Sequence, residues 1–160
     1  MRFEHLVQIN DLTAPGLERL SREQVWRGLA LRAYDPAYFI LGLEGCSIRN
    51  HERRDNEEVL ERTLHFGSFE VEDRVTLLHE QQTRVEVQAT DKWPHCTATF
   101  SIEEPEPQSL FIRFVYEWDD SKLAEHQLDD DSRLAREQAC HAADIDTVQR
   151  IRELAQQPLS

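Results

Sequence analysis

The stretch RTLHFGSFEVED, residues 62–73, predicts a tight β-hairpin and therefore a fold built on antiparallel strands. Gly67-Ser68 separates two runs in which apolar and polar residues alternate, and a glycine at the first central position suits a type II′ turn. With this turn, one face carries three apolar pairs: Phe66 with Phe69, Leu64 with Val71, and Leu60 with Val75. The other face carries polar or charged pairs: His65 with Glu70, Thr63 with Glu72, and Glu61 with Arg74. Both faces therefore support the same register.

The same register places two charged residues, Arg62 and Asp73, opposite each other within the apolar set. An isolated buried ion costs several kcal/mol even after the protein relaxes, so these side chains need partners or water unless the apolar face ends there. Two interpretations are open. Either the pair lies in a cavity and orients a polar group of a ligand, or it is a structural, bidentate ion pair that fixes the strand register.

Hydrophobic alternation continues on both sides of the hairpin and predicts a sheet. Residues 3–9 alternate in the manner of a half-buried strand. The hydrophobic period is two from Cys46 to Trp118, with turn-forming residues between the runs. This predicts six strands, at residues 46–54, 58–66, 69–79, 83–89, 95–104 and 110–118.

The register of the strand at 46–54 has two alternatives. A two-residue turn at Asp55-Asn56 turns Arg49 and His51 inward. A shift of one residue instead turns in Asn50 and Glu52, because successive side chains of a strand point to opposite faces.

Two short helices before residue 46 and a long helix at the C-terminus are predicted around these strands. Ser21 followed by Gln24 is a capping-box signature, and the helical stripe behind it contains Val25, Trp26, Leu29, Ala30 and Ala33. Asp35-Pro36 ends this helix and starts the second short helix through Tyr38. The long helix begins near Asp130 behind acidic capping residues, and its predicted sheet-facing stripe contains Leu134, Ile145, Val148 and Ala155.

Length and composition indicate one globular domain, residues 1–160. A net charge of −13 argues against nucleic acid or an anionic membrane as a partner. We find no apolar run that could span a bilayer and no signal-peptide pattern at the start. Three widely spaced cysteines, Cys46, Cys96 and Cys140, indicate a reducing cytoplasm and act as small apolar side chains. No phosphate-loop, dinucleotide or metal-site spacing is present, so we expect no cofactor and no metal.

Several further residues could line a ligand site, although no catalytic residue can be assigned. His5 lies on the apolar side of the first strand, and His141 lies near the middle of the predicted stripe of the long helix. If both reach one cavity they are general acid–base candidates, because an imidazole titrates near neutral pH; otherwise each is a hydrogen-bonded core residue. Four large side chains with polar atoms could line a pocket or pack in the core: Trp26, Tyr38, Tyr116 and Trp118.

Three segments together resemble the helix-grip fold of the START and birch-pollen-allergen-like superfamily, also called SRPBCC: LSREQVWRGLALRAYDPAYF (20–39), ERTLHFGSFEVEDRV (61–75) and LFIRFVYEW (110–118). The closer resemblance is to its AtaL-like branch, which includes bacterial allergen-like proteins. The resemblance implies an α+β fold in which a seven-stranded, curved antiparallel sheet wraps around a long C-terminal helix, with a cavity between them. Members of the superfamily bind lipids, sterols or polyketides, and some are polyketide cyclases, but no catalytic set is shared among them.

The leading hypothesis is therefore that the protein binds a small, largely hydrophobic molecule between the sheet and the C-terminal helix. Arg62, paired with Asp73, would hold a carbonyl, hydroxyl or carboxylate of the ligand. The weaker lining candidates are His5, Tyr116, Trp118 and His141, with Trp26 and Tyr38 at the entrance or inner wall. The alternatives are a polyketide cyclase or dehydratase that moves protons through His5 or His141, and a protein-interaction module. Self-association through an edge strand is possible, without a specific signal for it.

Overall fold

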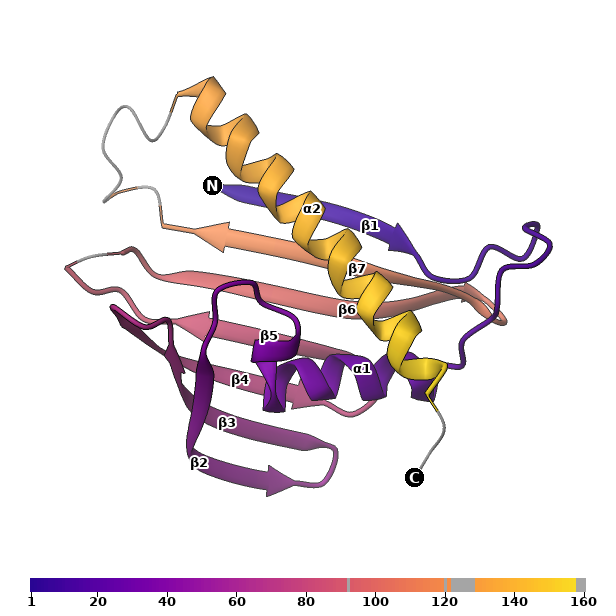
Figure 1. Cartoon of the computed structure of the whole chain (residues 1–160), viewed down its shortest axis with the longest axis horizontal. Coiled ribbons are helices and arrows are strands. Elements are labelled where there is room, and N and C mark those ends of the chain that lie inside the picture. Colours follow the sequence, from indigo (N-terminus) through magenta and orange to yellow (C-terminus); the bar gives the residue numbers. More distant parts are fainter. Residues whose placement is uncertain (92, 120, 122–128, 158–160) are drawn as a thin grey trace.

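The computed structural model describes residues 1–91, 93–119, 121 and 129–157, and within them the chain forms a seven-stranded antiparallel sheet (Figure 1). The strands are β1 (Arg2–Gln8), β2 (Gly45–Arg54), β3 (Glu57–His65), β4 (Glu70–Leu78), β5 (Gln82–Val87), β6 (Cys96–Glu106) and β7 (Ser109–Trp118). Their order in the sheet is β1-β7-β6-β5-β4-β3-β2, so the strands from β2 to β7 form successive hairpins and β1 completes the edge beside β7. The six strands predicted from the hydrophobic period are confirmed.

Two helices lie on one face of this sheet. α2 (Asp130–Ala155) runs diagonally across it, and α1 (Arg22–Tyr34) lies beside the C-terminal part of α2 (Figure 1). The start of α1 follows the sequence signal, because Ser21 and Gln24 form the complete reciprocal capping box. The arrangement confirms the predicted helix-grip fold of the α+β class.

The second predicted helix is a single 3₁₀ turn, η1 (Pro36–Tyr38). The proline fits the first position of the turn, and the Phe39 amide donates to the Pro36 carbonyl at 2.9 Å. Gly42 follows with a φ of +85°, a conformation that glycine adopts without strain, so the chain turns toward β2 before a longer helix can develop.

The β3–β4 hairpin has the predicted register, with Arg62 directly opposite Asp73 on the inner face. Gly67 in the turn has a φ of +86°, and the rings of Phe66 and Phe69 stack beside it with their centroids 5.0 Å apart. Two of the polar pairs expected on the outer face are also formed: His65 with Glu70 and Arg74 with Glu61. The hairpin therefore places the two charges on the helix-covered side of the sheet.

A bulge in β2 combines the two registers considered from the sequence. Near the Asp55-Asn56 turn the strand has the two-residue-turn pairing, which turns His51 toward the inner side at the exposed sheet edge. The register then shifts by one residue around Arg49, so that Ile48 rather than Arg49 lies on the inner side. The Arg49 guanidinium donates to the backbone carbonyl of Arg62 at 3.1 Å. The first alternative is therefore correct for His51 and wrong for Arg49, and the second is wrong for Asn50 and Glu52, which pair with outer-face residues of β3.

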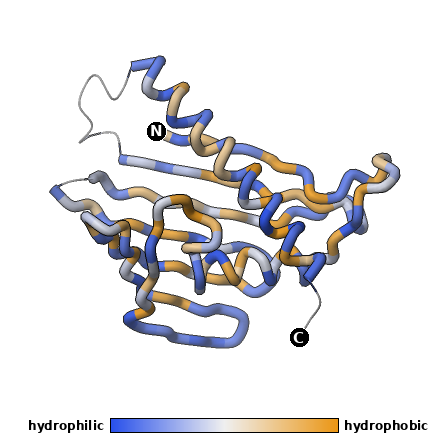
Figure 2. The backbone as a smooth tube through the Cα atoms, in the orientation of Figure 1, coloured by the Kyte–Doolittle hydropathy of each residue, from blue (hydrophilic) through white to orange (hydrophobic). Residues whose placement is uncertain are grey.

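The stripe of α2 that faces the sheet differs from the predicted one. Its buried residues are Asp144, Thr147, Val148 and Ile151. Leu134 and Ile145 are 53% and 47% exposed, so these two predictions are wrong, whereas Val148 is confirmed. The C-terminal half of α2 reaches the core, while its first turns extend beyond the sheet edge and are mostly hydrophilic (Figures 1 and 2).

The core fills the space between α1, the C-terminal half of α2 and one end of the sheet. Its fully or almost fully buried side chains include Val25, Leu29, Leu60, Val75, Phe100, Ile112, Phe114 and Ile151. Gly28 allows α1 to approach α2 closely, because a Cβ atom at this position would stand 2.6 Å from Ile151 Cγ1. The two helices are therefore held together at this end of the sheet.

Candidate functional site

Arg62 and Asp73 form a two-bond ion pair on the inner face of the sheet. Arg62 Nε donates to Asp73 Oδ1 at 2.9 Å, and Nη2 donates to Oδ2 at 2.6 Å. Nη1 donates to the carbonyl oxygen of Ala33 at 2.6 Å, near the C-terminal end of α1. Each guanidinium nitrogen thus has an acceptor within the protein, and the pair connects β3, β4 and α1.

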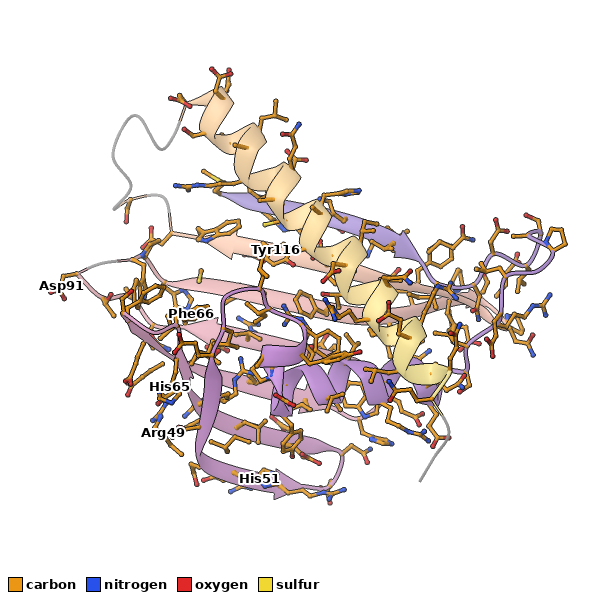
Figure 3. All side chains as sticks on the ribbon, in the orientation of Figure 1. Arg49, His51, His65, Phe66, Asp91 and Tyr116 are labelled. Carbon is orange, nitrogen blue, oxygen red and sulfur yellow. The ribbon has the colours of Figure 1, made fainter. Side chains whose placement is uncertain are left out.

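A second polar cluster connects β1, β7 and α2. Asp144 is buried and accepts one hydrogen bond from His5 Nδ1, at 2.6 Å, and one from the Tyr116 hydroxyl. Figure 3 shows Tyr116 beside α2 on the covered face of the sheet. His141 is exposed rather than central in the buried stripe, so that prediction is wrong, but its ring packs edge-on against the His5 ring at 4.5 Å. The structure therefore brings together three of the predicted residues and adds Asp144.

Burial determines the protonation of this cluster. Burial raises the pKa of Asp144, and the hydrogen bonds from Tyr116 and His5 offset part of that rise. Burial and the nearby Asp144 charge raise the pKa of Tyr116, and the same two causes raise the pKa of Cys140 to about 11. Tyr116 and Cys140 therefore keep their protons near neutral pH, and the Tyr116 hydroxyl acts as a hydrogen-bond donor.

Between the two polar clusters the inner face carries half-buried side chains, which we call the open patch. Its six residues lie next to one another on β5, β6 and β7: Val85, Val87, Cys96, Ala98, Tyr116 and Trp118. Asp73 pairs with Val87 at one side, and Tyr116 contacts Asp144 at the other. On the same inner face, the neighbouring residues toward the core are buried: Thr83, Phe100 and Phe114. The helices therefore fill one end of this face and leave accessible surface at the other.

Arg32, in the last turn of α1, lies over the buried end of the same face. Its guanidinium carbon is 4.8 Å from the centroid of the Phe100 ring. Its Nε atom is buried and has no hydrogen-bond partner among the described residues. Burial lowers the pKa of Arg32, and the charges of Asp144 and Asp73 act in the opposite direction.

The large aromatic candidates divide between this face and other regions. Trp118 belongs to the open patch and stacks on Tyr116 at 6.1 Å. Trp26 is buried in the core and lines a separate groove of about 240 Å³ between α1 and the β2–β3 hairpin. Tyr38 is exposed on η1, where the Arg150 guanidinium lies 5.2 Å from its ring. Trp26 and Tyr38 are therefore not part of the open patch.

Asp144 and Arg32 were not among the residues predicted from the sequence. Asp144 lies three and four residues before the buried Thr147 and Val148, and Arg32 lies three residues after the buried Leu29. Both positions follow the helical period of the buried residues. That period alone does not identify them, because charged side chains at such positions are normally assigned to the solvent.

No group of three or more His, Cys, Asp or Glu side chains is placed to hold a metal ion in the part of the chain that the structure describes. Neither described helix has an apolar stretch sufficient to cross a bilayer.

The sheet that grips a C-terminal helix is the helix-grip fold, which a START superfamily protein of known structure shares. The chain belongs to the AtaL family, described as "Acetylaranotin biosynthesis cluster protein L", whose sequence profile matches residues 7–158. A search of curated protein sequences gave no match.

Solved structures support the fold assignment. The Zhui aromatase/cyclase from Streptomyces sp. R1128 is 12% identical, with a TM-score of 0.58 over 94% of this chain and 90% of that one. A START superfamily protein from Mycobacterium smegmatis is 16% identical, with a TM-score of 0.56 over 96% and 98% of the two chains. The di-domain ARO/CYC StfQ from the steffimycin biosynthetic pathway is 13% identical, with a TM-score of 0.63 over 96% of this chain and 50% of that one. Identities at this level indicate a shared fold and leave function to the site.

Proposed function

We propose that the protein binds a small, largely hydrophobic molecule on the open patch, between the sheet and α2. The burial pattern carries this proposal, because six adjacent inner-face side chains keep accessible surface while the next residues on this face are buried. Val85, Val87 and Ala98 offer accessible apolar surface, and Tyr116 and Trp118 add aromatic surface with polar atoms. The named activities of the similar structures, aromatase/cyclase among them, support the same type of ligand.

We propose a structural role for Arg62 and Asp73 at the border of the patch. A ligand oxygen would have to compete with the acceptors that the Arg62 nitrogens already have. The ligand-holding role of Arg62 therefore stays a prediction that the geometry does not favour. The remaining lining candidates are His5, Tyr116, Trp118 and His141, whereas we place Trp26 and Tyr38 outside the site.

The test is titration with N-phenyl-1-naphthylamine, a neutral apolar dye whose fluorescence rises in apolar surroundings. Ala98→Phe should fill the patch and weaken dye binding about tenfold or more, because the added ring occupies the ligand's volume. Thr99→Phe, the neighbouring position on the outer face, is the matched control and should change the affinity by less than about twofold. Equal affinity in wild type and both variants would remove the patch as the site. Extraction and mass spectrometry of purified protein would then identify any co-purified ligand.

The Asp144 cluster favours a second candidate function, a polyketide cyclase or dehydratase. The Tyr116 hydroxyl and the His5 imidazole both contact the Asp144 carboxylate at the border of the patch. In this role Tyr116 would have to turn its single O–H from Asp144 to a substrate carbonyl. The His5 imidazole, held by Asp144 through Nδ1, would take a proton from the adjacent carbon through Nε2.

Heptane-2,6-dione is a simple probe of that activity, because its intramolecular aldol condensation releases water and gives a conjugated enone that absorbs in the ultraviolet. Asp144→Asn should lower the condensation rate about 100-fold while leaving N-phenyl-1-naphthylamine binding unchanged. Turnover that survives His5→Gln together with His141→Gln would exclude the histidines as the proton-transfer groups. Absence of condensation by the wild type would leave binding as the function.

We also propose a cytoplasmic location and no nucleic-acid partner. The three cysteines are free thiols, as expected for a reducing compartment. The net charge of −13 disfavours contact with a phosphate backbone.

A further inference from the structure

Arg32 is half-buried and differs from the buried charges of the inner face in having no acceptor among the described residues. Among the described residues it makes no hydrogen bond and no ion pair, and its Nε atom is buried. The neighbouring carboxylates already have donors: Asp73 receives two from Arg62, and Asp144 receives one each from His5 and Tyr116. The half-buried guanidinium therefore has a buried Nε atom without an acceptor, while the nearby carboxylates are engaged by other donors.

The geometry around Arg32 is suited to recognition of an anion. The Phe100 ring, 4.8 Å from the guanidinium carbon, supports the guanidinium by a cation–π contact. Phe100 also contacts Tyr116 of the open patch, with ring centroids 5.9 Å apart, so the guanidinium lies next to the proposed ligand surface. A guanidinium presents donors in a rigid plane that matches the two oxygens of an anionic group.

We propose that Arg32 holds the anionic oxygen group of an otherwise apolar ligand, such as a carboxylate or an enolate, while the apolar part lies on the open patch. This inference rests on the proposed binding function and specifies the ligand class. Because Arg32 holds no carboxylate or carbonyl among the described residues, its replacement by Met should not lower stability, whereas removal of an arginine that pairs with a buried carboxylate does. The two roles therefore predict opposite effects on stability.

The test compares two dyes that differ by one charged group, 8-anilinonaphthalene-1-sulfonate and the neutral N-phenyl-1-naphthylamine. Arg32→Met should weaken binding of the sulfonate dye about tenfold or more and leave binding of the neutral dye within about twofold. Arg32→Lys should retain part of the sulfonate affinity, because it keeps the charge but not the planar donor fork. The melting temperature of Arg32→Met should stay equal to or above that of the wild type. Arg27→Met, at an exposed position of the same helix, is the control and should bind both dyes as the wild type does.

The outcomes separate this inference from the proposed function. If Arg32→Met binds the neutral dye and keeps the wild-type affinity for the sulfonate dye, the role of Arg32 alone is wrong. Equal weakening of both dyes, or a lower melting temperature, would make Arg32 a structural residue and overturn the inference as well. If the wild type bound neither dye, the binding function and the role of Arg32 would both be wrong.

Discussion

Arg62 and Asp73 stand directly opposite each other on β3 and β4 and form an ion pair whose side chains are 3% and 1% exposed. Because the third Arg62 nitrogen holds the Ala33 carbonyl, the pair also attaches the end of α1 to the sheet. Removal of one partner leaves the other charge buried without compensation. We expect Arg62→Met and Asp73→Leu each to lower the free energy of unfolding by about 3–5 kcal/mol, measured by urea denaturation.

The double variant Arg62→Met/Asp73→Leu distinguishes a buried ion pair from general core disruption. It removes both charges, so we expect it to be more stable than either single variant, by an interaction free energy of at least about 2 kcal/mol. Additive effects of the two substitutions would contradict the ion-pair explanation.

Asp144 should give the protein a specific pH dependence. Burial raises its folded pKa above the unfolded value of about 3.9, so between these two pKa values the folded state binds more protons. Its contribution to stability is therefore fully present below about pH 4 and is lost as the pH rises through the folded pKa. The free energy of unfolding of the wild type minus that of Asp144→Asn should fall as the pH rises above about 4.

The matched control for this measurement is Asp146→Asn on the exposed side of α2, where the carboxylate pairs with Arg150. The free energy of unfolding of the wild type minus that of Asp146→Asn should not fall with rising pH, because this carboxylate is exposed to solvent. A wild-type advantage over Asp144→Asn that grows with rising pH would mean that the hydrogen bonds to Asp144 outweigh the cost of its burial.

Tyr116→Phe tests the hydrogen bond that Asp144 accepts from β7. Loss of the hydroxyl leaves a buried carboxylate with one donor fewer, so we expect the free energy of unfolding to fall by about 1–3 kcal/mol at pH 8. Tyr34→Phe makes the same chemical change in an exposed contact to Glu58 and should cost less than about 1 kcal/mol. Equal costs at the two sites would show that burial does not strengthen the Tyr116 contact.

The sequence predicted those parts of the fold that depend on neighbouring residues. The Gly67-Ser68 turn and the period of two determine the β3–β4 register, and the Ser21–Gln24 box determines where α1 begins. The bulge at Arg49 could not be predicted, because no local pattern indicates where along β2 the register set by the turn ends. It depends on how the strand fits against β3 across its whole length.

The candidate site shows the same limit. His5, Tyr116 and Trp118 were predicted from strand alternation, since a period of two assigns each residue to a face. Asp144 could not be assigned to the buried face of α2 in the same way, because its burial depends on donors from two distant strands. Such partners are known only when the helix is placed against the sheet.

Gly28 offers a test of the α1–α2 contact, because local and tertiary effects predict opposite results. In an isolated helix alanine is more stable than glycine by about 1 kcal/mol. Here the added Cβ would stand 2.6 Å from Ile151 Cγ1, and overpacking of this kind costs about 1–3 kcal/mol. We expect Gly28→Ala to lower the free energy of unfolding in the wild type but not in an Ile151→Ala background, where the clashing atoms are absent. Gly45→Ala is the control, because a Cβ atom there meets nothing within 4 Å. A stabilising effect of Gly28→Ala in the wild type would show that the helices are farther apart than this contact requires.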